Sequence, residues 1–550
     1  MCSPFSFRSI DSQECEMPGI INRQYLILFV LVLVILAIRI STIAIPSLEW
    51  TSWKEIDYLY ISQGYVANGF NFFLPESGWP AEPPRTTEME FPLVPYLAAI
   101  TYKAFGFNVY TARLLTLVAF LLIMVFVFRL VERETDAMTA LLASFVAGVL
   151  PLYHPFGKDL FSEPMMIAMS VASIYYFAEF IEFGRRKDWI LSLVSISLTF
   201  ALKLESLYLF LPFSFILCRK HGLALHEYLK PGLLLILSLL LPVVWYTYAY
   251  YLEVTGAHLF GIFSGHNKLQ TYTMLSQFRW YRLMAGRVFS GIFGGLYGTI
   301  LFAVGLIVSA ATKRGGIFYA YLVSVIVYFC LVAEGNIDAP YRQLCLIPAG
   351  SFFVAVGIKY LLQRSSEMWK RITTVDFSNV GTAITLVVGL LLVLPIGLGR
   401  LSEIFADDAP RFSQRWEIAK VIREHSHTAA KIIVVGEYTK HVGGYDLSPV
   451  LYYYSGRQGW TLTPEQWDLA RIAELRARGA ELLIIFNSYG TDPVMNQTEV
   501  SSAPFAERLK SVYPVLYEGH ESIVFDLSRS ATEKEISKLW GLDQTGSEFT

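Results

Sequence analysis

The stretch around which the fold is organised runs from Trp53 to Leu93 and reads WKEIDYLYISQGYVANGFNFFLPESGWPAEPPRTTEMEFPL. It follows a long hydrophobic run, and among its aromatic residues and prolines it carries Glu55, Asp57, Glu88 and Glu90. A loop between two membrane-spanning segments has little reason to be so aromatic unless it folds back onto another part of the protein. We therefore expect this loop to form the roof of a site that faces the membrane.

The composition places the chain among membrane proteins. Hydrophobic residues make up 54% of the 550 residues and charged residues only 16%, which lies outside the usual soluble range. Uninterrupted apolar segments that are long enough to cross a bilayer core of about 30 Å recur along the chain. They predict a polytopic α-helical membrane protein with about eleven transmembrane helices, near residues 24–44, 109–130, 137–153, 162–182, 189–201, 204–218, 231–251, 288–311, 316–333, 343–362 and 379–399.

The distribution of lysine and arginine predicts how the chain is oriented. These residues gather on alternate predicted loops, as they do on the cytoplasmic side of membrane proteins, at positions 129–133, 185–187, 219–220, 313–314 and 364–371. The N-terminus is then cytoplasmic, while the first long loop (45–108) and the C-terminal tail are extracytoplasmic. We expect an integral, multi-pass protein of a bacterial inner or plasma membrane. The net charge of -2 gives no reason to expect a nucleic-acid partner.

The composition changes near residue 400. The segments 431–436, 481–487 and 521–527 are typical of strands, and 413–425 and 464–478 are typical of helices. We therefore divide the chain into a transmembrane domain, residues 1–400, and an extracytoplasmic α/β domain, residues 401–550.

Charged residues of both signs gather near the predicted extracytoplasmic ends of the spans. Ionisable residues at membrane depth are costly, by about 2.5–3.5 kcal/mol, and usually line a pathway or a site. A mixture of carboxylates and cations suits a substrate with an anionic headgroup on a lipid tail. The cations would hold a phosphate, and a carboxylate would take the proton of a hydroxyl group.

The acidic candidates in the first loop are Asp57, Glu88 and Glu90. Asp57 is the expected base, and the alternative is a helix cap or a partner for Lys54 or Arg85. Glu88 and Glu90 share one face of an extended segment. They could bind a divalent metal ion or an acceptor amine, or they could be two solvated acids.

The candidates for substrate binding are mostly basic. Lys203 lies between apolar segments, where it could bind a phosphate, pair with Glu205 or extend towards water. Of the arginines on the 252–287 loop, Arg279 could clamp a phosphate through its bidentate fork. Arg342 precedes a span. Asp159 belongs to a polar patch that also fits an ordinary helix start.

Nucleotide-binding motifs do not occur in the sequence. We find no phosphate-binding loop of the Walker type and no dinucleotide fingerprint in a strand–turn–helix context. His258 and His266 lack a zinc-binding spacing. Any sugar donor is therefore expected to be linked to a lipid.

A series of weak motifs occurs in a fixed order over about the first 210 residues: Asp57, Gly69, Phe73-Leu74-Pro75, Glu90-Phe91-Pro92-Leu93, Tyr96-Leu97, Phe105-Gly106, Ala112-Arg113 and Ala201-Leu202-Lys203. In this order the chain resembles the polyprenyl-phosphate-sugar-dependent glycosyltransferases of the C superfold, a group that includes protein O-mannosyltransferases and lipid A aminoarabinose transferases. The chain departs from the pattern at Phe91, where the family has lysine, so a phosphate contact from that position is not carried over.

The resemblance implies an inverting transfer of a sugar from a polyprenyl-phosphate donor to a hydroxyl group of an acceptor glycan, lipid or protein. Asp57 would activate or orient the acceptor, and Glu90 would help to build the site or bind a metal ion. Lys203 and Arg342 would stabilise the departing lipid phosphate. The sequence leaves the sugar, the acceptor, the metal dependence and the oligomeric state open.

Two other classes of function remain as alternatives. A transporter or flippase of lipid-linked saccharides would be expected to show related halves and broken helices with charges near mid-span. A noncatalytic assembly subunit of the cell envelope would tolerate alanine at its loop carboxylates.

Overall fold

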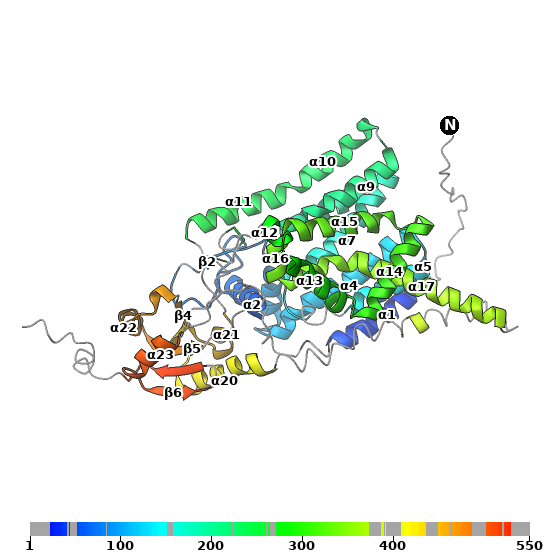
Figure 1. The fold of residues 1–550 in the computed structure, drawn as a ribbon. Coiled ribbons are helices and arrows are strands. Elements are labelled where there is room, and N and C mark those ends of the chain that lie inside the picture. Colours follow the sequence, from blue (N-terminus) through cyan, green and yellow to red (C-terminus); the bar gives the residue numbers. More distant parts are fainter. Residues whose placement is uncertain are drawn as a thin grey trace, which may run out of the picture.

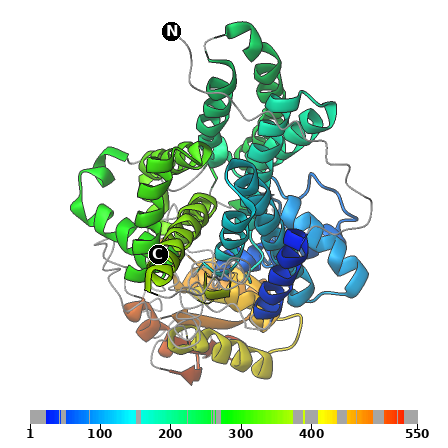
Figure 2. The ribbon, with the colours of Figure 1, turned by 90° about the vertical axis from the view of Figure 1, so that its right-hand side faces the viewer.

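The structure is a computed structural model that describes residues 23–40, 43, 52–83, 85–150, 158–222, 224–256, 258–259, 262–263, 271–372, 387–389, 391, 409–435, 449–462, 464–486, 502–519 and 522–529. A helical body is joined at one end by a small sheet (Figure 1). In the end-on view, the blue helices near the start of the chain and the green helices between residues 270 and 340 lie on opposite sides of the central helices (Figure 2).

The first half of the body consists of helices and one short strand. They are α1 (Arg23–Ile40), α2 (Ser52–Ala67), β1 (Thr87–Glu88), α3 (Leu93–Phe105), α4 (Val109–Glu134), α5 (Ala137–Val149), α7 (Ser162–Phe183), α8 (Arg186–Leu202), η1 (Leu204–Leu209) and α9 (Phe210–His221). The predicted break at Lys203 is present, because this residue is extended between α8 and η1 (φ -152°, ψ 114°).

The second half continues the same pattern. Its elements are η2 (Leu225–Tyr228), α10 (Leu229–Ser238), α11 (Leu240–Val254), β2 (His258–Leu259), α12 (Thr271–Leu275), α13 (Phe278–Gly286), η3 (Arg287–Ile292), α14 (Leu296–Thr312), α15 (Gly316–Leu331), α16 (Ala333–Asp338), η4 (Pro340–Leu346) and α17 (Ile347–Ile372).

Four helices in the described ranges are long and apolar enough to cross a membrane: 109–134, 162–183, 226–254 and 340–364. The sequence predicts one straight span at 288–311, but the chain bends there by 95° between Phe278–Ile292 and Leu296–Thr312. If this bent pair is counted as one span, it is the fifth in the described ranges. The apolar helices Gln24–Ile40, Ala137–Val149 and Gly316–Leu331 are shorter. The count of eleven stays a prediction, and most of 379–399 lies outside the described residues.

The first long loop contains two helices, α2 and α3. Gly64 allows the chain after α2 to cross that helix closely, because a Cβ atom at this position would lie 2.2 Å from the Glu76 carbonyl oxygen. Helix α2 ends at Ala67, and Gly69 and Phe70 just after it both have positive φ. The returning chain then brings β1 beside β2 as a short parallel pair.

The C-terminal region, residues 409–529, contains a five-stranded sheet of order β4-β3-β5-β7-β6. The strands β3 (Lys431–Val435), β4 (Gln458–Leu462) and β5 (Ala480–Phe486) are parallel, whereas β7 (Ser522–Asp526) is antiparallel to β5 and β6 (Val515–Glu518). The helical elements are α20 (Ala409–His425), α21 (Val450–Ser455), η5 (Pro464–Gln466), α22 (Leu469–Ala477) and α23 (Ala503–Lys510). The predicted strands near 431, 481 and 521 are confirmed, while the boundary near residue 400 stays a prediction.

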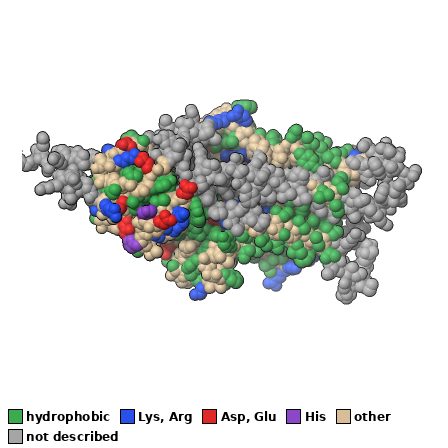
Figure 3. All heavy atoms as spheres, turned by 90° about the horizontal axis from the view of Figure 1, so that it is seen from below, with side chains coloured by type: hydrophobic (Ala, Val, Ile, Leu, Met, Phe, Trp, Pro, Cys, Tyr) green, Lys and Arg blue, Asp and Glu red, His purple; other side chains and the backbone are tan. Residues whose placement is uncertain are grey.

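The first loop folds back onto this sheet. Residues 78–81 run beside β4, where Gly459 donates its backbone N–H to the Trp79 carbonyl oxygen and accepts from Ala81, both at 3.0 Å. The Trp79 ring stacks on Tyr452 with centroids 4.9 Å apart. The loop thus lies between the helical body and the sheet. Charged side chains gather over the sheet end of the molecule, and hydrophobic ones dominate the helical body (Figure 3).

Candidate active site at a buried ionic cluster

Helix α2 directs its side chains to three different surroundings. Lys54 and Tyr58 are four residues apart, so they lie on one face, which turns towards the start of α7. Glu55 lies about 100° around the helix from Lys54 and turns towards α4. Ile56 and Tyr60 face the C-terminal region, where they pack in one hydrophobic cluster with Trp79, Val450 and Tyr452.

Two lysines and two glutamates meet at the first of these faces, and we call Lys54, Glu90, Glu163 and Lys203 the lysine cluster. Lys54 Nζ lies 2.6 Å from Glu163 Oε1 and 3.7 Å from Glu90 Oε1. Lys203 Nζ contacts the same two oxygens at 3.0 and 2.8 Å. The four residues come from α2, the segment before α3, the first turn of α7 and the break after α8.

Hydrogen bonds complete the surroundings of Glu90. The Tyr58 hydroxyl donates to Glu90 Oε1 at 2.8 Å, and the Ser162 hydroxyl donates to the same atom at 3.2 Å. Burial by itself would raise the pKa of Glu90, but the positive charges of Lys203 and then Lys54 outweigh it and hold the pKa well below its usual range. The surroundings of Glu90 therefore favour its ionised form.

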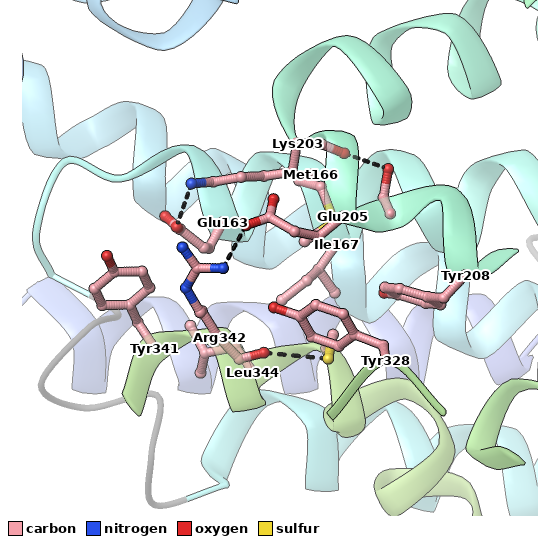
Figure 4. A pocket seen from close by; sticks show the side chains of 12 residues that line it. Glu163, Met166, Ile167, Lys203, Glu205, Tyr208, Tyr328, Tyr341, Arg342 and Leu344 are labelled. Carbon is pink, nitrogen blue, oxygen red and sulfur yellow. Dashed lines mark hydrogen bonds and ion pairs between the residues drawn. The ribbon is translucent and has the colours of Figure 1, made fainter. Parts of the chain in front are cut away.

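A cavity lies against this cluster, with about 320 Å³ of empty space. Figure 4 shows Lys203, Glu163, Glu205, Arg342 and Tyr341 around it. The full lining is Glu163, Met166, Ile167, Lys203, Glu205, Ser206, Tyr208, Tyr328, Tyr341, Arg342, Leu344 and Cys345. Arg342 belongs to η4 and forms an ion pair with Glu205 of η1.

Both cations of the cavity have N–H groups open to a further acceptor. The Lys203 ammonium has three donors, and its ion pairs within the described residues go to Glu90 and Glu163. The Nε of Arg342 is buried and has no hydrogen-bond partner in the described part of the chain. Open donors of this kind suit an anionic group that carries several oxygens, such as a phosphate.

A second buried ionic cluster lies on the neighbouring face of α2, and we call Glu55, Arg113, Asp159 and Lys158 the arginine cluster. Arg113 binds Glu55 with two parallel hydrogen bonds, Nε to Oε1 at 2.8 Å and Nη2 to Oε2 at 2.7 Å. The same Nη2 lies 3.2 Å from Asp159 Oδ1, which also contacts Lys158 at 3.0 Å. These residues do not line the cavity, so Asp159 lies apart from Lys203 and Arg342.

Asp57 lies inside α2, so the alternative that it caps a helix is wrong. The ion pairs of Lys54 go to Glu163 and Glu90 within the described residues. By helix geometry Asp57 lies about 60° from Lys54 on one side and about 60° from Tyr60 on the other. It is mostly buried, between the lysine cluster and the face of α2 that packs on the C-terminal region.

Glu88 and Glu90 have different hydrogen-bond donors. Glu88 accepts from the backbone N–H groups of Ile262 and Phe263 at 3.0 and 3.2 Å, whereas Glu90 belongs to the lysine cluster. No group of three or more His, Cys, Asp and Glu side chains arranged to hold a metal ion occurs in the part of the chain that is described. Metal binding by this pair stays a prediction.

Arg279 and Phe91 lie outside the cavity lining. Arg279 is half-buried on α13 and is not among the described residues that line the cavity. Phe91, at the position of the family lysine, has its ring 5.2 Å from that of Phe72 and 5.5 Å from that of Trp245. The loop is therefore aromatic at the point where the chain departs from the family pattern.

The sequence gives little sign of the roles of Lys54 and Glu163. Lys54 is expected there only as a partner of Asp57, and an acid such as Glu163 in the first turn of a helix is ordinary. The spacing of Lys54 and Tyr58, which places both on one face of a helix, is the signal that could have found Lys54. The contacts that bring Lys54 to Glu163, 109 residues away, belong to the tertiary structure.

Comparisons with known proteins agree with this fold. The family model for dolichyl-phosphate-mannose-protein mannosyltransferase matches residues 84–246. No curated protein matches the chain. The structure of ArnT from Cupriavidus metallidurans bound to undecaprenyl phosphate superposes with a TM-score of 0.60 at 13% identity, covering 91% of this chain and 97% of that one.

The oligosaccharyltransferase AglB from Archaeoglobus fulgidus, in complex with an inhibitory peptide and a dolichol-phosphate, gives a TM-score of 0.55 at 11% identity. The match covers 93% of this chain and 74% of that one. At such identities the likeness shows the fold, which is that of the membrane glycosyltransferases of the C superfold. The resemblance predicted from the order of the motifs is thereby confirmed.

Proposed function

We propose that this chain, which has the fold of the C-superfold glycosyltransferases, transfers a sugar from a polyprenyl-phosphate donor to an acceptor hydroxyl on the extracytoplasmic side of a membrane. One observation carries the proposal. Lys203 and Arg342, which lie far apart in the sequence, meet in one cavity with donors open to an anion. The cavity shares Glu163 and Lys203 with the lysine cluster, to which α2, the helix that carries Asp57, contributes Lys54.

The donor phosphate would bind between the two cations. The third N–H of Lys203 and the Nε of Arg342 are the donors that the structure leaves open. When the bond between the sugar and the phosphate breaks, negative charge accumulates on the phosphate oxygens. Fixed donors at such a position are worth roughly 10²–10³ in rate each, because they are already oriented in a site that excludes water.

The acceptor would approach from the side of Asp57. Its carboxylate would take the proton of the acceptor hydroxyl while the oxygen attacks the anomeric carbon from the face opposite the phosphate, which inverts the configuration. General-base assistance of this kind contributes roughly 10²–10⁴ in rate. The packed rings of Phe72, Phe91 and Trp245 in the roof would exclude water, so that the donor is not hydrolysed.

The decisive experiment incubates the purified protein with polyprenyl-phosphate sugars and candidate acceptors, and measures the release of free polyprenyl phosphate. Asp57→Asn is expected to abolish release with little change in donor binding, because the amide cannot take a proton. Glu76→Gln is the matched control in the same loop, since Glu76 has no side-chain ion pair among the described residues. Full activity of Asp57→Asn would remove Asp57 from the mechanism.

The same assay separates the alternatives. A flippase would move the lipid-linked saccharide across vesicles without releasing polyprenyl phosphate. A noncatalytic assembly subunit would release none and would support envelope assembly in cells after alanine replacement of Asp57 and Lys203. Either outcome with well-folded protein would overturn the proposed transfer.

A further inference from the structure

A second cavity lies at the other end of the helical body, among α4, α7 and the start of α8. It is larger than the first, with about 1020 Å³ of empty space, and it is lined by Val125, Phe126, Arg129, Tyr175, Tyr176, Glu179, Arg185, Lys187 and Asp188. Glu163 and Glu179, at opposite ends of α7, are 16 residues apart, which is about 24 Å of helix. The two cavities are therefore separated by most of a bilayer core.

The acids of this second cavity are neutralised by arginines. Arg185 pairs with Glu179 at 2.6 Å and with Asp188 at 2.5 Å. Arg133, just outside the lining, pairs with Glu179 as well. The guanidinium groups of Arg185 and Arg133 thus neutralise the carboxylates of Glu179 and Asp188. These two acids do not neutralise the other cations of the cavity.

The remaining cations are Arg129 and Lys187. Arg129 donates to the Tyr25 hydroxyl at 2.6 Å and lies 3.9 Å from Glu132, and 43% of its side chain is exposed. Lys187 is exposed and forms no ion pair with any described residue. The Tyr175 and Tyr176 hydroxyls make no hydrogen bond to the part of the chain that is described. The rim therefore offers N–H and O–H donors for an anion.

The wall beneath this rim is apolar and aromatic. The Phe126 and Tyr176 rings meet edge to face with centroids 5.7 Å apart, and Val125 of α4 is exposed beside them. Helices α4 and α7 are both long and apolar enough to cross a membrane. A ligand here would thus have its charge at the rim and its apolar part along the helices, as a membrane lipid does.

We propose that this cavity binds the phosphate headgroup of a lipid in the leaflet at that end of the helices. The phosphate would lie between Arg129 and Lys187, and an acyl or prenyl chain would follow Val125 and Phe126. Basic pockets between transmembrane helices are known to bind phosphorylated headgroups. The chemistry fits both a phospholipid and a polyprenyl phosphate, and the site is independent of the proposed transfer reaction.

The test measures lipid binding to the full-length protein in detergent, with spin-labelled phosphatidylglycerol and, separately, undecaprenyl phosphate as the probes. The double variant Arg129→Gln, Lys187→Gln is expected to bind at least one of the two lipids about tenfold more weakly. The reason is that each cation beside an anionic headgroup contributes to the binding free energy. Arg129→Lys with Lys187→Arg should retain binding. Val125→Trp, which narrows the cavity without changing any charge, should also weaken it.

The matched control is Arg219→Gln with Lys220→Gln. These cations lie in the last turn of α9, outside the cavity, and pair with Glu134 and Glu182. An equal loss of binding in this control would show general surface attraction and overturn the site, as would unchanged binding in the Arg129, Lys187 variant.

The two probes identify the lipid. Weakened binding of phosphatidylglycerol, with or without weakened binding of undecaprenyl phosphate, would assign the cavity to membrane phospholipid. Weakened binding of undecaprenyl phosphate alone would assign it to the carrier. Binding of undecaprenyl phosphate is also measured with the Lys203→Gln variant. A loss of binding in that variant reports on the first cavity, so the failure of one site can be told from the failure of the other.

Discussion

The lysine cluster and the arginine cluster lie on neighbouring faces of α2 and are about equally buried, yet they differ in how completely their charges are satisfied. Arg113 fits its planar fork onto both oxygens of Glu55 and uses a further N–H for Asp159. In the lysine cluster, Lys54 and Lys203 share single oxygens of Glu90 and Glu163 beside a cavity. Burial of charge is therefore common to both clusters, whereas open donors beside a cavity occur at the lysine cluster and support it as the candidate site.

The difference follows from the two kinds of cation. Guanidinium is planar, and it matches a carboxylate with two parallel hydrogen bonds, which suits a permanent contact. Ammonium is a compact charge on a flexible stem with three donors, so it can exchange one partner for another. We infer that the arginine cluster holds α2 in place and that the lysine cluster is the part that responds to substrate.

The substitution Arg113→Met is expected to have the largest effect, which is a loss of folding stability. It would leave Glu55 and Asp159 without their common partner in a buried position, and breaking a buried ion pair in this way costs about 3–5 kcal/mol. Thermal unfolding of the purified protein would measure the loss. Arg113→Lys, which keeps the charge but not the fork, should be intermediate. A variant as stable as the unmodified protein would show that this cluster does not hold α2.

The substitution Lys203→Gln is expected to have the next largest effect, which is a loss of catalytic rate. The loss of one fixed donor facing the phosphate is expected to lower kcat/KM by roughly 10²–10³. The loss of stability should be smaller than for Arg113→Met, because Glu163 borders the cavity whereas Glu55 and Asp159 do not. Turnover and unfolding temperature are measured on the same preparation. If stability fell as far as in Arg113→Met while kcat/KM of the folded fraction was unchanged, the two clusters would have the same role.

Lys54→Gln should have a smaller catalytic effect. Lys54 contacts Glu163 and Glu90 but does not line the cavity, so we expect it to position these acids while Lys203 binds the phosphate. Losing a hydrogen bond to a charged group costs about 1.5–3 kcal/mol. Here we expect part of this free energy to be lost from folding stability and part to appear as a lower kcat. Steady-state kinetics should show a lower kcat at nearly unchanged KM. A rise in KM alone would mean that Lys54 itself contacts the donor.

The smallest effect is expected from Glu205→Gln, and it has the opposite sign. Glu205 neutralises Arg342 and would compete with an incoming phosphate for it. Removing its charge should strengthen binding of polyprenyl phosphate by roughly fivefold, since a partly exposed pair of this kind is worth about 1 kcal/mol. Titration with the lipid would measure the change. Weaker binding would show that Glu205 orients Arg342 more than it competes with the ligand.

The individual residues show how far sequence reasoning reaches. The order of short motifs predicted the fold, and Lys203 was correctly placed at a break between helices. Arg342 and Lys203 lie next to apolar segments on the same predicted side, and in the structure both line one cavity. Their role in substrate binding stays a prediction. The sequence predicts the segment around Asp57 as part of a long loop, but it forms a helix, so the sequence alone does not place Lys54 beside Glu90.

The sequence by itself determined that this is a membrane protein with a C-terminal sheet, because apolar runs and strand patterns are local properties of the chain. It also supplied the candidate cations, since charges next to apolar segments are rare enough to be noticed. Only the tertiary structure decided which carboxylate meets which cation. Lys54 and Glu55 are adjacent in sequence, yet one joins Glu163 and the other Arg113, because neighbouring residues of a helix point about 100° apart and what each one meets is set by distant parts of the chain.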